Sequence, residues 1–436
     1  MRVLLISDWA ATGFGRVGRE LAAGLAARGH DLRIIAINWR GLTGETEAIA
    51  RSVEGPPSER WRAAADEVAS EPFLDRIIAA NAHGDGMGHN LTYPALTGAL
   101  WQAWKPEAAI IVADPKAMMI RLEQDGGSIG RSSLTGVPVY NYVPIEGTGL
   151  PEAYRIIWRY VKPVAMSDFG KAELERLLGQ PVDVAYHGVS RAFRPLSPAE
   201  PGKVRGTPVT TPDGAKAAFG FGGRTLILRA DRYTMRKNYP ALFRVMRPVL
   251  AKHPEAVLFL HTVPMDDLGM GNVWELMSRE PGAVHEGGPV WRHPQIVLSG
   301  AHDSWRGLTD DELRCLYAAA DLYVSPTMAE GFGLCLAESL ACGTPVVATD
   351  YSAIPEVVGP GGFLIPPTTT YTNPYAHEWA LVDEARMTEA VERLVSKPSL
   401  RRSLGAAGRK HVARFTWDRA VEVFDRLITE AAAVAA

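Results

Sequence analysis

The sequence predicts an α/β fold with two parallel sheets, each covered by helices on both faces. Three observations lead to this prediction. Short apolar runs typical of buried strands alternate with segments of helical periodicity along the chain. Residues 195–223, which are dense in proline and glycine, separate these runs into two sets. The 436 residues are 47% hydrophobic, which is enough material for two large cores.

The expected strands are continuous apolar runs, as found in sheets buried on both faces. The first set is 3–6, 32–37, 108–112, 137–142, 163–166 and 182–186, and the second is 225–228, 257–260, 295–298, 322–324 and 345–348. Residues 195–223 are expected to form a linker and a surface loop. Residues 41–60 and 262–294 are expected to be insertions or surface loops, and residues 417–427 an amphipathic helix.

Composition narrows the class of protein. The net charge of −3 gives no indication of a protein that coats nucleic acid. The three cysteines show no C-x-x-C spacing and fit small buried hydrophobes in a reducing compartment. The chain begins with a strand and has no apolar run of about 18 residues. These features predict a cytoplasmic protein without stable membrane insertion, and scattered tryptophans in the first half leave peripheral membrane contact open.

A glycine-rich segment follows the first strand. Gly13, Gly15 and Gly18 form a G-x-G-x-x-G pattern ahead of a predicted helix, where backbone amides bind phosphates. A nicotinamide enzyme would also place an acidic residue after the second strand, but that strand is followed by Asn38, Trp39 and Arg40. The pattern therefore leaves open an NAD(P)-dependent oxidoreductase, a site for another phosphorylated ligand, or a tight turn without a ligand.

Two carboxylates stand near the start of a helix in the second half. Glu330 precedes Gly331-Phe332-Gly333, a helix is expected from Leu334, and Glu338 lies about one turn inside it. Carboxylates can accept from hydroxyls, and exposed amides at the helix start can donate to oxyanions. A polyol joined to a phosphate needs this combination. The alternative interpretation is that both glutamates are solvated and the glycines only turn the chain.

Four cations follow another strand of the second half. They are Arg229, Arg232, Arg236 and Lys237. They lie between a strand ending near Leu228 and a helix expected from Tyr239, and ligands of α/β sheets bind at such carboxyl ends. Arginine and lysine suit phosphate oxygens, although a solvated basic loop would look the same in isolation.

Together these stretches resemble family-4 retaining glycosyltransferases of the GT-B architecture. The residues that carry the resemblance in the second half are A-D-R-Y-T-M-R-K-N from 230 and E-G-F-G-L-C-L-A-E from 330. In the first half they are G-F-G from 13, M-S-D-F-G-K-A-E-L from 166 and Y-H-G-V-S-R-A-F-R-P from 186. The C-terminal segment A-R-F-T-W-D-R-A from 413 also fits. The resemblance is stronger in the second half.

The resemblance implies two Rossmann-like domains that face each other across a cleft. The expected divisions are an acceptor-binding domain at 1–195, a linker and loop at 196–223, a nucleotide-sugar-binding domain at 224–414, and a helix at 415–436 that crosses back to the first domain.

The resemblance also implies roles for individual residues. Arg232 and Lys237 would grip a diphosphate, Glu330 would contact donor-sugar hydroxyls, and Glu338 would hold the ribose. Further donor contacts are expected at Gly13, Phe14, Gly15, Gly331, Phe332, Gly333 and Leu334. Many members carry a histidine after the strand matching 137–142, but this chain does not. Glu146 or Asp114 is expected to take that place, the alternative being that each is an ordinary loop carboxylate, and His187 is expected to be structural.

The expected reaction moves a sugar from a nucleoside-diphosphate sugar to an acceptor hydroxyl with retention of configuration. No metal or other cofactor is expected, because Arg232 and Lys237 would stabilise the leaving diphosphate. The donor base and sugar are open, and residues 299–309 are expected near the base. The acceptor is open among a glycan, a lipid, a protein, a small molecule and modified nucleic acid. The alternatives are an NAD(P)-dependent oxidoreductase, an epimerase or sugar phosphorylase of the same architecture, and an inactive binding protein.

Overall fold

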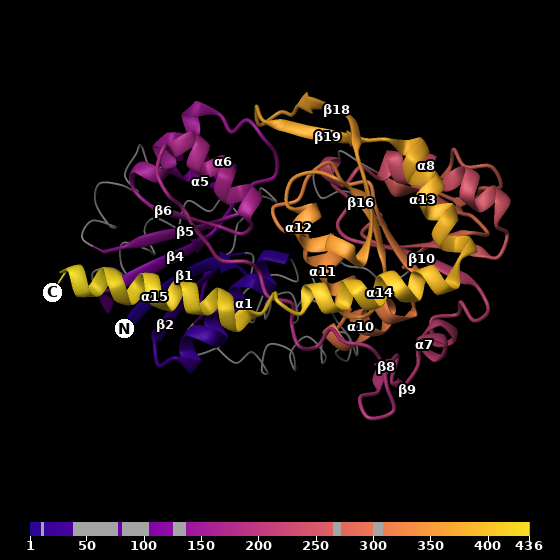
Figure 1. The fold of residues 1–436 in the computed structure, drawn as a ribbon, viewed down its shortest axis with the longest axis horizontal. Coiled ribbons are helices and arrows are strands. Elements are labelled where there is room, and N and C mark those ends of the chain that lie inside the picture. The colour runs from indigo at the N-terminus through magenta and orange to yellow at the C-terminus, as the bar shows by residue number, and fades with distance from the viewer. Residues whose placement is uncertain are drawn as a thin grey trace, which may run out of the picture. The chain divides into compact units, whose positions relative to one another are not determined.

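A computed structural model describes residues 1–9, 13–37, 77–80, 104–124, 137–264, 272–299 and 308–435 (Figure 1). The chain divides into two compact units. The first comprises residues 1–143, 153–164 and 421–436, and the second comprises 144–152 and 165–420. No helix within the described ranges is long and apolar enough to cross a membrane. The cytoplasmic location and the boundaries at 195, 223 and 414 stay predictions.

The N-terminal sheet has seven strands in the order β3-β2-β1-β4-β5-β6-β7. They are β1 (Arg2–Asp8), β2 (Asp31–Ile37), β3 (Ile77–Ala80), β4 (Ala108–Val112), β5 (Val139–Val143), β6 (Lys162–Ala165) and β7 (Asp183–Val184). The pairs β3·β2, β2·β1, β1·β4 and β4·β5 are parallel. The accompanying helices are α1 (Gly13–Ala27), α5 (Pro115–Gln124), η3 (Glu152–Arg159) and α6 (Asp168–Leu178). The predicted strands of this half are confirmed, with shifted ends.

The segment with the glycine pattern is not the turn that was predicted. Helix α1 already begins at Gly13, so Gly15 and Gly18 lie within the helix, and residues 10–12 are outside the described part. Gly18 allows α1 to approach β1 closely, because a Cβ there would lie 2.6 Å from Ser7 Oγ. At least one of the three glycines therefore serves helix–strand packing.

Part of the last helix packs in the first unit. Helix α15 spans Trp417–Ala435, and from Val421 onward it belongs to that unit. The Phe424 ring meets Tyr142 edge-on with 5.0 Å between ring centroids. The Tyr140 hydroxyl donates to the carbonyl of Leu427 at 2.7 Å. The predicted amphipathic helix at 417–427 is thus present and longer than expected.

The second unit is built around a six-stranded sheet in the order β14-β11-β10-β15-β16-β17. Its strands, all parallel, are β10 (Thr225–Ala230), β11 (Ala256–His261), β14 (Ile296–Leu298), β15 (Leu322–Ser325), β16 (Val346–Thr349) and β17 (Gly362–Ile365). The main helices are α8 (Tyr239–Lys252), α10 (Asp310–Ala319), α11 (Leu334–Ala341), α12 (Ile354–Val358), α13 (Glu384–Ser396) and α14 (Pro398–Val412).

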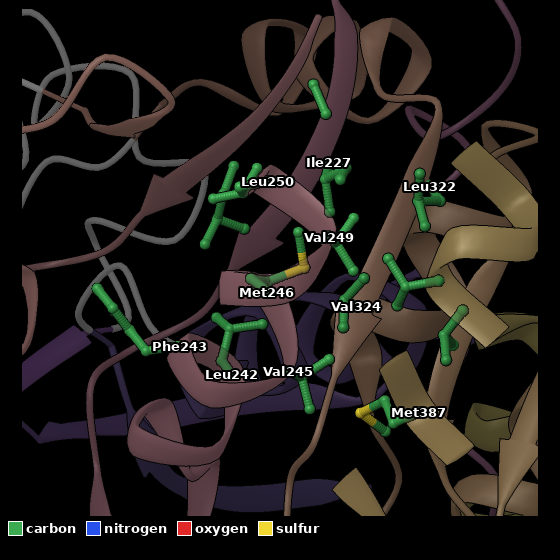
Figure 2. Close-up of a cluster of buried hydrophobic side chains, with 14 of the residues drawn as sticks. Ile227, Leu242, Phe243, Val245, Met246, Val249, Leu250, Leu322, Val324 and Met387 are labelled. Atoms are coloured by element: carbon green, nitrogen blue, oxygen red, sulfur yellow. The ribbon is translucent and has the colours of Figure 1, made fainter. Parts of the chain in front are cut away.

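One face of α8 forms the centre of the second unit's core. Met246 and Val249 have no exposed surface, and Figure 2 shows them beside Ile227 of β10 and Val324 of β15. Met387 of α13 joins the same cluster. Burial of these apolar side chains fixes α8 and α13 against the sheet and so fixes the loops at the strand ends.

Two segments predicted as loops contain secondary structure, and one further hairpin had no prediction. Residues 195–223 include the hairpin β8 (Gly202–Val204)–β9 (Thr207–Val209) and helix α7 (Pro212–Ala218). The linker prediction was wrong there, because Thr211 caps α7 and Pro212 occupies its first turn. Residues 262–294 contain α9 (Val273–Met277), β12 (Val284–Gly287) and β13 (Val290–Arg292). The hairpin β18 (Pro367–Thr372)–β19 (Glu378–Val382) was not predicted. The segments 41–60 and 300–307 lie outside the described residues.

Candidate active site

The first loop of the candidate site follows β10. It ends in a 3-10 turn, η4 (Met235–Lys237), and then in Asn238 with φ of 53°. Asparagine tolerates this left-handed conformation, and its side chain accepts from the Ala241 amide at the start of α8. The turn therefore holds two cations, Arg236 and Lys237, at the carboxyl end of β10.

The second loop follows β15, the neighbour of β10 in the sheet. It runs through Glu330 to Gly333, which precedes α11 with φ of 97°. The helix begins at Leu334, as predicted. Because β10 and β15 are adjacent and parallel, both loops leave the same edge of the sheet and come together there.

Glu330 is the centre of this meeting point, and 7% of its surface is exposed. Its Oε1 accepts from Lys237 Nζ at 2.7 Å and from Thr327 Oγ1 at 3.1 Å. Its Oε2 accepts from Arg236 Nη1 at 2.7 Å. The Glu330 amide donates to Ser352 Oγ at 2.8 Å, which fixes the backbone as well. Both carboxylate oxygens are thus oriented by charged donors.

The charges around Glu330 keep it ionised. Burial alone would raise its pKa, but the nearby charges of Arg236 and Lys237 and their hydrogen bonds lower it to about 2. The pKa of Arg236 is raised, because its own burial is outweighed by the carboxylates of Glu146 and Glu330. Glu330 and Arg236 are therefore both charged across the neutral range.

A third loop brings Glu146 to the cluster. Glu146 Oε1 lies 2.9 Å from Arg236 Nη2, so this guanidinium bridges Glu146 and Glu330. The backbones of the two glutamate loops approach closely, because a Cβ on Gly331 would lie 2.4 Å from Pro144 Cβ. The packing of the two loops therefore requires a glycine at position 331.

The cations of the first loop have distinct surroundings. Arg229 has no exposed surface, and its guanidinium lies 2.6 Å from Asp231 and donates to the carbonyl of Lys237 at 3.0 Å. Arg229 therefore fixes the backbone of the loop through buried contacts. Arg232 is exposed, and it is Arg236, four positions later, that lies against Glu330. Lys237 and Glu330, both predicted site residues, form an ion pair in the structure, and neither this pairing nor the part taken by Arg236 was predicted.

Glu338 and Phe332 are more buried than the predicted donor contacts suggest. Glu338 is 3% exposed, and one of its oxygens accepts from the Tyr317 hydroxyl at 3.1 Å. The Phe332 ring lies 5.0 Å from the His187 ring, between centroids. Burial lowers the pKa of His187 to about 3, so the imidazole is neutral and packs as an aromatic ring. Trp417 flanks its ring at 5.5 Å.

The remaining predicted residues lie in the first unit. Asp114 Oδ1 accepts from the Ala117 amide at 2.8 Å, so its carboxylate caps the start of α5. Gly13, Phe14 and Gly15 form the first turn of α1. Their predicted contact with a diphosphate stays a prediction.

Comparison with known proteins finds a family match over part of the chain. The model of the family described as "Glycosyl transferases group 1" matches residues 291–396, which include Glu330 and Glu338. The chain is 37% identical over 144 residues to an MMP alpha-(1->4)-mannosyltransferase of Mycolicibacterium hassiacum, covering 32% of each chain. It is 37% identical over 125 residues to a D-inositol 3-phosphate glycosyltransferase of Streptomyces bingchenggensis, covering 28% of this chain and 24% of the relative.

The match to the glycosyl transferases group 1 family covers residues 291–396, less than half of the chain. The matches fit GT-B glycosyltransferases of the family-4 type, as predicted, and they give no support to the oxidoreductase alternative. The chain spans about a third of the length of the mannosyltransferase that it matches.

Solved structures extend the likeness to the whole chain. Sucrose-phosphate synthase from Thermosynechococcus elongatus is similar with a TM-score of 0.66 over 100% of both chains, at 16% identity. Anabaena Alr3699/HepE in complex with UDP and glucose is similar with a TM-score of 0.62 over 99% of this chain and 100% of that one, at 12% identity. The predicted GT-B class of α/β fold is confirmed by this likeness.

Proposed function

We propose that this chain is a retaining glycosyltransferase that moves a sugar from a nucleoside-diphosphate sugar to an acceptor hydroxyl without a metal ion. The observation that carries the proposal is the buried cluster of Glu330, Arg236 and Lys237 at the carboxyl ends of β10 and β15. It lies partly within the group 1 domain. The neighbour solved with UDP and glucose supports a nucleoside-diphosphate donor.

Lys237 and the arginines of its loop act on the leaving group. Negative charge grows on the diphosphate as the glycosidic bond breaks, so a cation placed there stabilises the transition state more than the ground state. Lys237 Nζ is oriented by Glu330 and by Asp231, 3.5 Å away. Arg232 lies on the same loop and is exposed, and it contacts the diphosphate as well. These cations take the part that a divalent metal has in other transferases.

Glu330 positions groups and serves neither as nucleophile nor as base. Its pKa of about 2 makes it a poor proton acceptor at neutral pH. Each carboxylate oxygen can accept more than one hydrogen bond, so donor-sugar hydroxyls can still bind to it. The departing phosphate takes the proton of the acceptor hydroxyl.

Glu146 takes the position of the family's first-domain histidine. Its ion pair with Arg236 ties it to the same cluster as Glu330, whereas the carboxylate of Asp114 is engaged as a helix cap. Glu338, in the helix that follows the Glu330 loop, binds the ribose hydroxyls.

Donor stabilisation and product analysis test the proposal. The full chain is heated with UDP-, GDP- and ADP-hexoses, and a bound donor raises the unfolding temperature. Transfer is then followed by NMR, which reports the anomeric configuration of the product, with and without EDTA. A retained configuration and full activity in EDTA are expected. An epimerised nucleotide sugar, a sugar phosphate formed from inorganic phosphate, or donor binding without any turnover would each replace the proposal by one of the alternatives.

A further inference from the structure

The hairpin β18–β19 has no part in the proposed mechanism, although it contacts the loop that carries Glu146. The Glu378 amide donates to the carbonyl of Thr148 at 2.8 Å. Tyr351 joins the two segments, because its hydroxyl donates to the Glu378 carbonyl at 3.0 Å and accepts from the Thr148 amide at 3.1 Å. Gly147 permits this approach, since a Cβ there would lie 2.2 Å from the Glu378 carbonyl oxygen.

The hairpin also contacts the loop that carries Glu330. The Ala380 amide donates to the carbonyl of Met328 at 3.1 Å, two residues before Glu330. The Tyr371 hydroxyl lies 3.3 Å from the Met328 sulfur. The hairpin is therefore fixed to two of the loops that form the charged cluster, and its position follows theirs.

Three polar groups at the tip of the hairpin are buried without a hydrogen-bond partner. They are Asn373 Nδ2, His377 Nδ1 and Trp379 Nε1, in residues that are 4%, 7% and 4% exposed. Asn373 Oδ1 accepts from the Tyr375 amide at 2.7 Å, which fixes Nδ2 as the unpaired end. Native proteins rarely leave such groups unpaired, so three within seven residues indicate a ligand that pairs them.

The chemistry of the tip selects a neutral, hydroxyl-rich ligand. The rings of Tyr371 and Tyr375 lie 6.2 and 6.1 Å from the Trp379 ring, between centroids, and pack with it in a small apolar cluster that includes Met328. Residues 367–382 contain no lysine or arginine and one acidic residue, so the segment has no cation for a phosphate. Burial lowers the pKa of His377, which keeps the imidazole neutral. Aromatic faces beside a few amide-type groups suit the C–H face and hydroxyls of a sugar ring.

We propose that the tip of this hairpin, residues 373–379, is a saccharide subsite that binds the sugar ring of the acceptor beside Glu146. Binding requires the side chains of the tip to move apart while the strands stay bonded to the two loops, and the three unpaired nitrogens then bond to the hydroxyls of the ring. The identification of the bound sugar as the acceptor rests on the proposed function. The presence of a saccharide site can be tested separately.

The test is saturation-transfer NMR on the full chain with three probes: methyl α-D-glucopyranoside, methyl α-D-mannopyranoside and myo-inositol. Trp379→Phe removes the indole N–H and keeps an aromatic ring, and Asn373→Asp keeps the accepting oxygen and removes the donor. Trp417→Phe is the matched control, because the indole nitrogen of Trp417 is also buried without a partner but lies outside the hairpin. Unfolding temperatures are measured for each variant.

The expected result is that at least one probe binds the wild-type chain and binds both hairpin variants about three- to tenfold more weakly, as for the loss of one hydrogen bond. The control should keep the wild-type affinity. If Asn373→Asp fails to fold, Trp379→Phe decides. Absence of probe binding to the wild-type chain, or equal affinity in Trp379→Phe, overturns the inference. Stabilisation by a nucleotide sugar, measured in parallel, separates this failure from a failure of the proposed function.

Discussion

Replacement of Glu330 by glutamine tests whether the charged cluster is built around this carboxylate. The substitution keeps the size of the side chain and removes its charge. A pKa lowered from 4.5 to about 2 corresponds to about 3 kcal/mol in favour of the ionised form in the folded state. Lys237 and Arg236 would still have Asp231 and Glu146, so we expect the variant to lose about 2–3 kcal/mol at pH 7.

The pH dependence has a defined sign. The folded-state pKa of Glu330 lies below the ordinary value, so its stabilising contribution is complete above about pH 4.5 and is lost as the pH falls toward 2. Calorimetry should therefore show the unfolding temperature of the variant about 2–5 °C below wild type at pH 7, and a smaller gap at pH 3.

A matched control is Glu384→Gln. Glu384 lies 2.6 Å from Arg244 at the surface, where such pairs contribute about 1 kcal/mol or less. A central role for the Glu330 charge is contradicted if Glu330→Gln unfolds at the wild-type temperature at pH 7. It is also contradicted if the difference in unfolding temperature from wild type is the same at pH 3 as at pH 7.

Three further predictions follow from the same cluster and its supports. Lys237→Ala should lower kcat about 10²–10³-fold in a transfer assay, with Lys252→Ala as a surface control, and equal turnover in the two variants would contradict the assignment. His187 is neutral in the folded protein with a pKa of about 3, so folding opposes its protonation and stability falls between pH 6.5 and 3. His187→Phe should flatten that part of the stability curve, and an unchanged curve would show that another group is responsible. Gly331→Ala places a methyl group 2.4 Å from Pro144 Cβ, so it should lower kcat at least tenfold by displacing the loop, and wild-type kinetics would show that the loops tolerate separation.

Apolar runs were sufficient to predict most strands of both sheets and the starts of α8 and α11. Strands of a parallel sheet are buried on both faces, so they appear in the sequence as short continuous apolar runs. The hairpin at 367–382 was missed because its first strand is a run of threonines with little apolar alternation, and its pairing depends on contacts with Thr148 and Met328 that are distant in sequence.

The residue types of the candidate site were predictable from the sequence, but the ion pairs between them were not. Four cations within nine residues indicated an anion site, yet the 3-10 turn at 235–237 is what directs Arg236 toward Glu330. Sequence spacing gives no measure of that direction. Likewise, Gly18 belongs to a helix despite its poor helix propensity, since contact with Ser7 leaves no room for a side chain.

The placement of α15 has a consequence for biosynthesis. The ribosome makes Tyr140 287 residues before Leu427, the residue whose carbonyl its hydroxyl bonds. Until then the aromatic ring of Tyr142 has no Phe424 to cover it, and the nascent first unit exposes an apolar strip. Chains interrupted before residue 421 should therefore be prone to aggregate even when every strand of that unit has been translated.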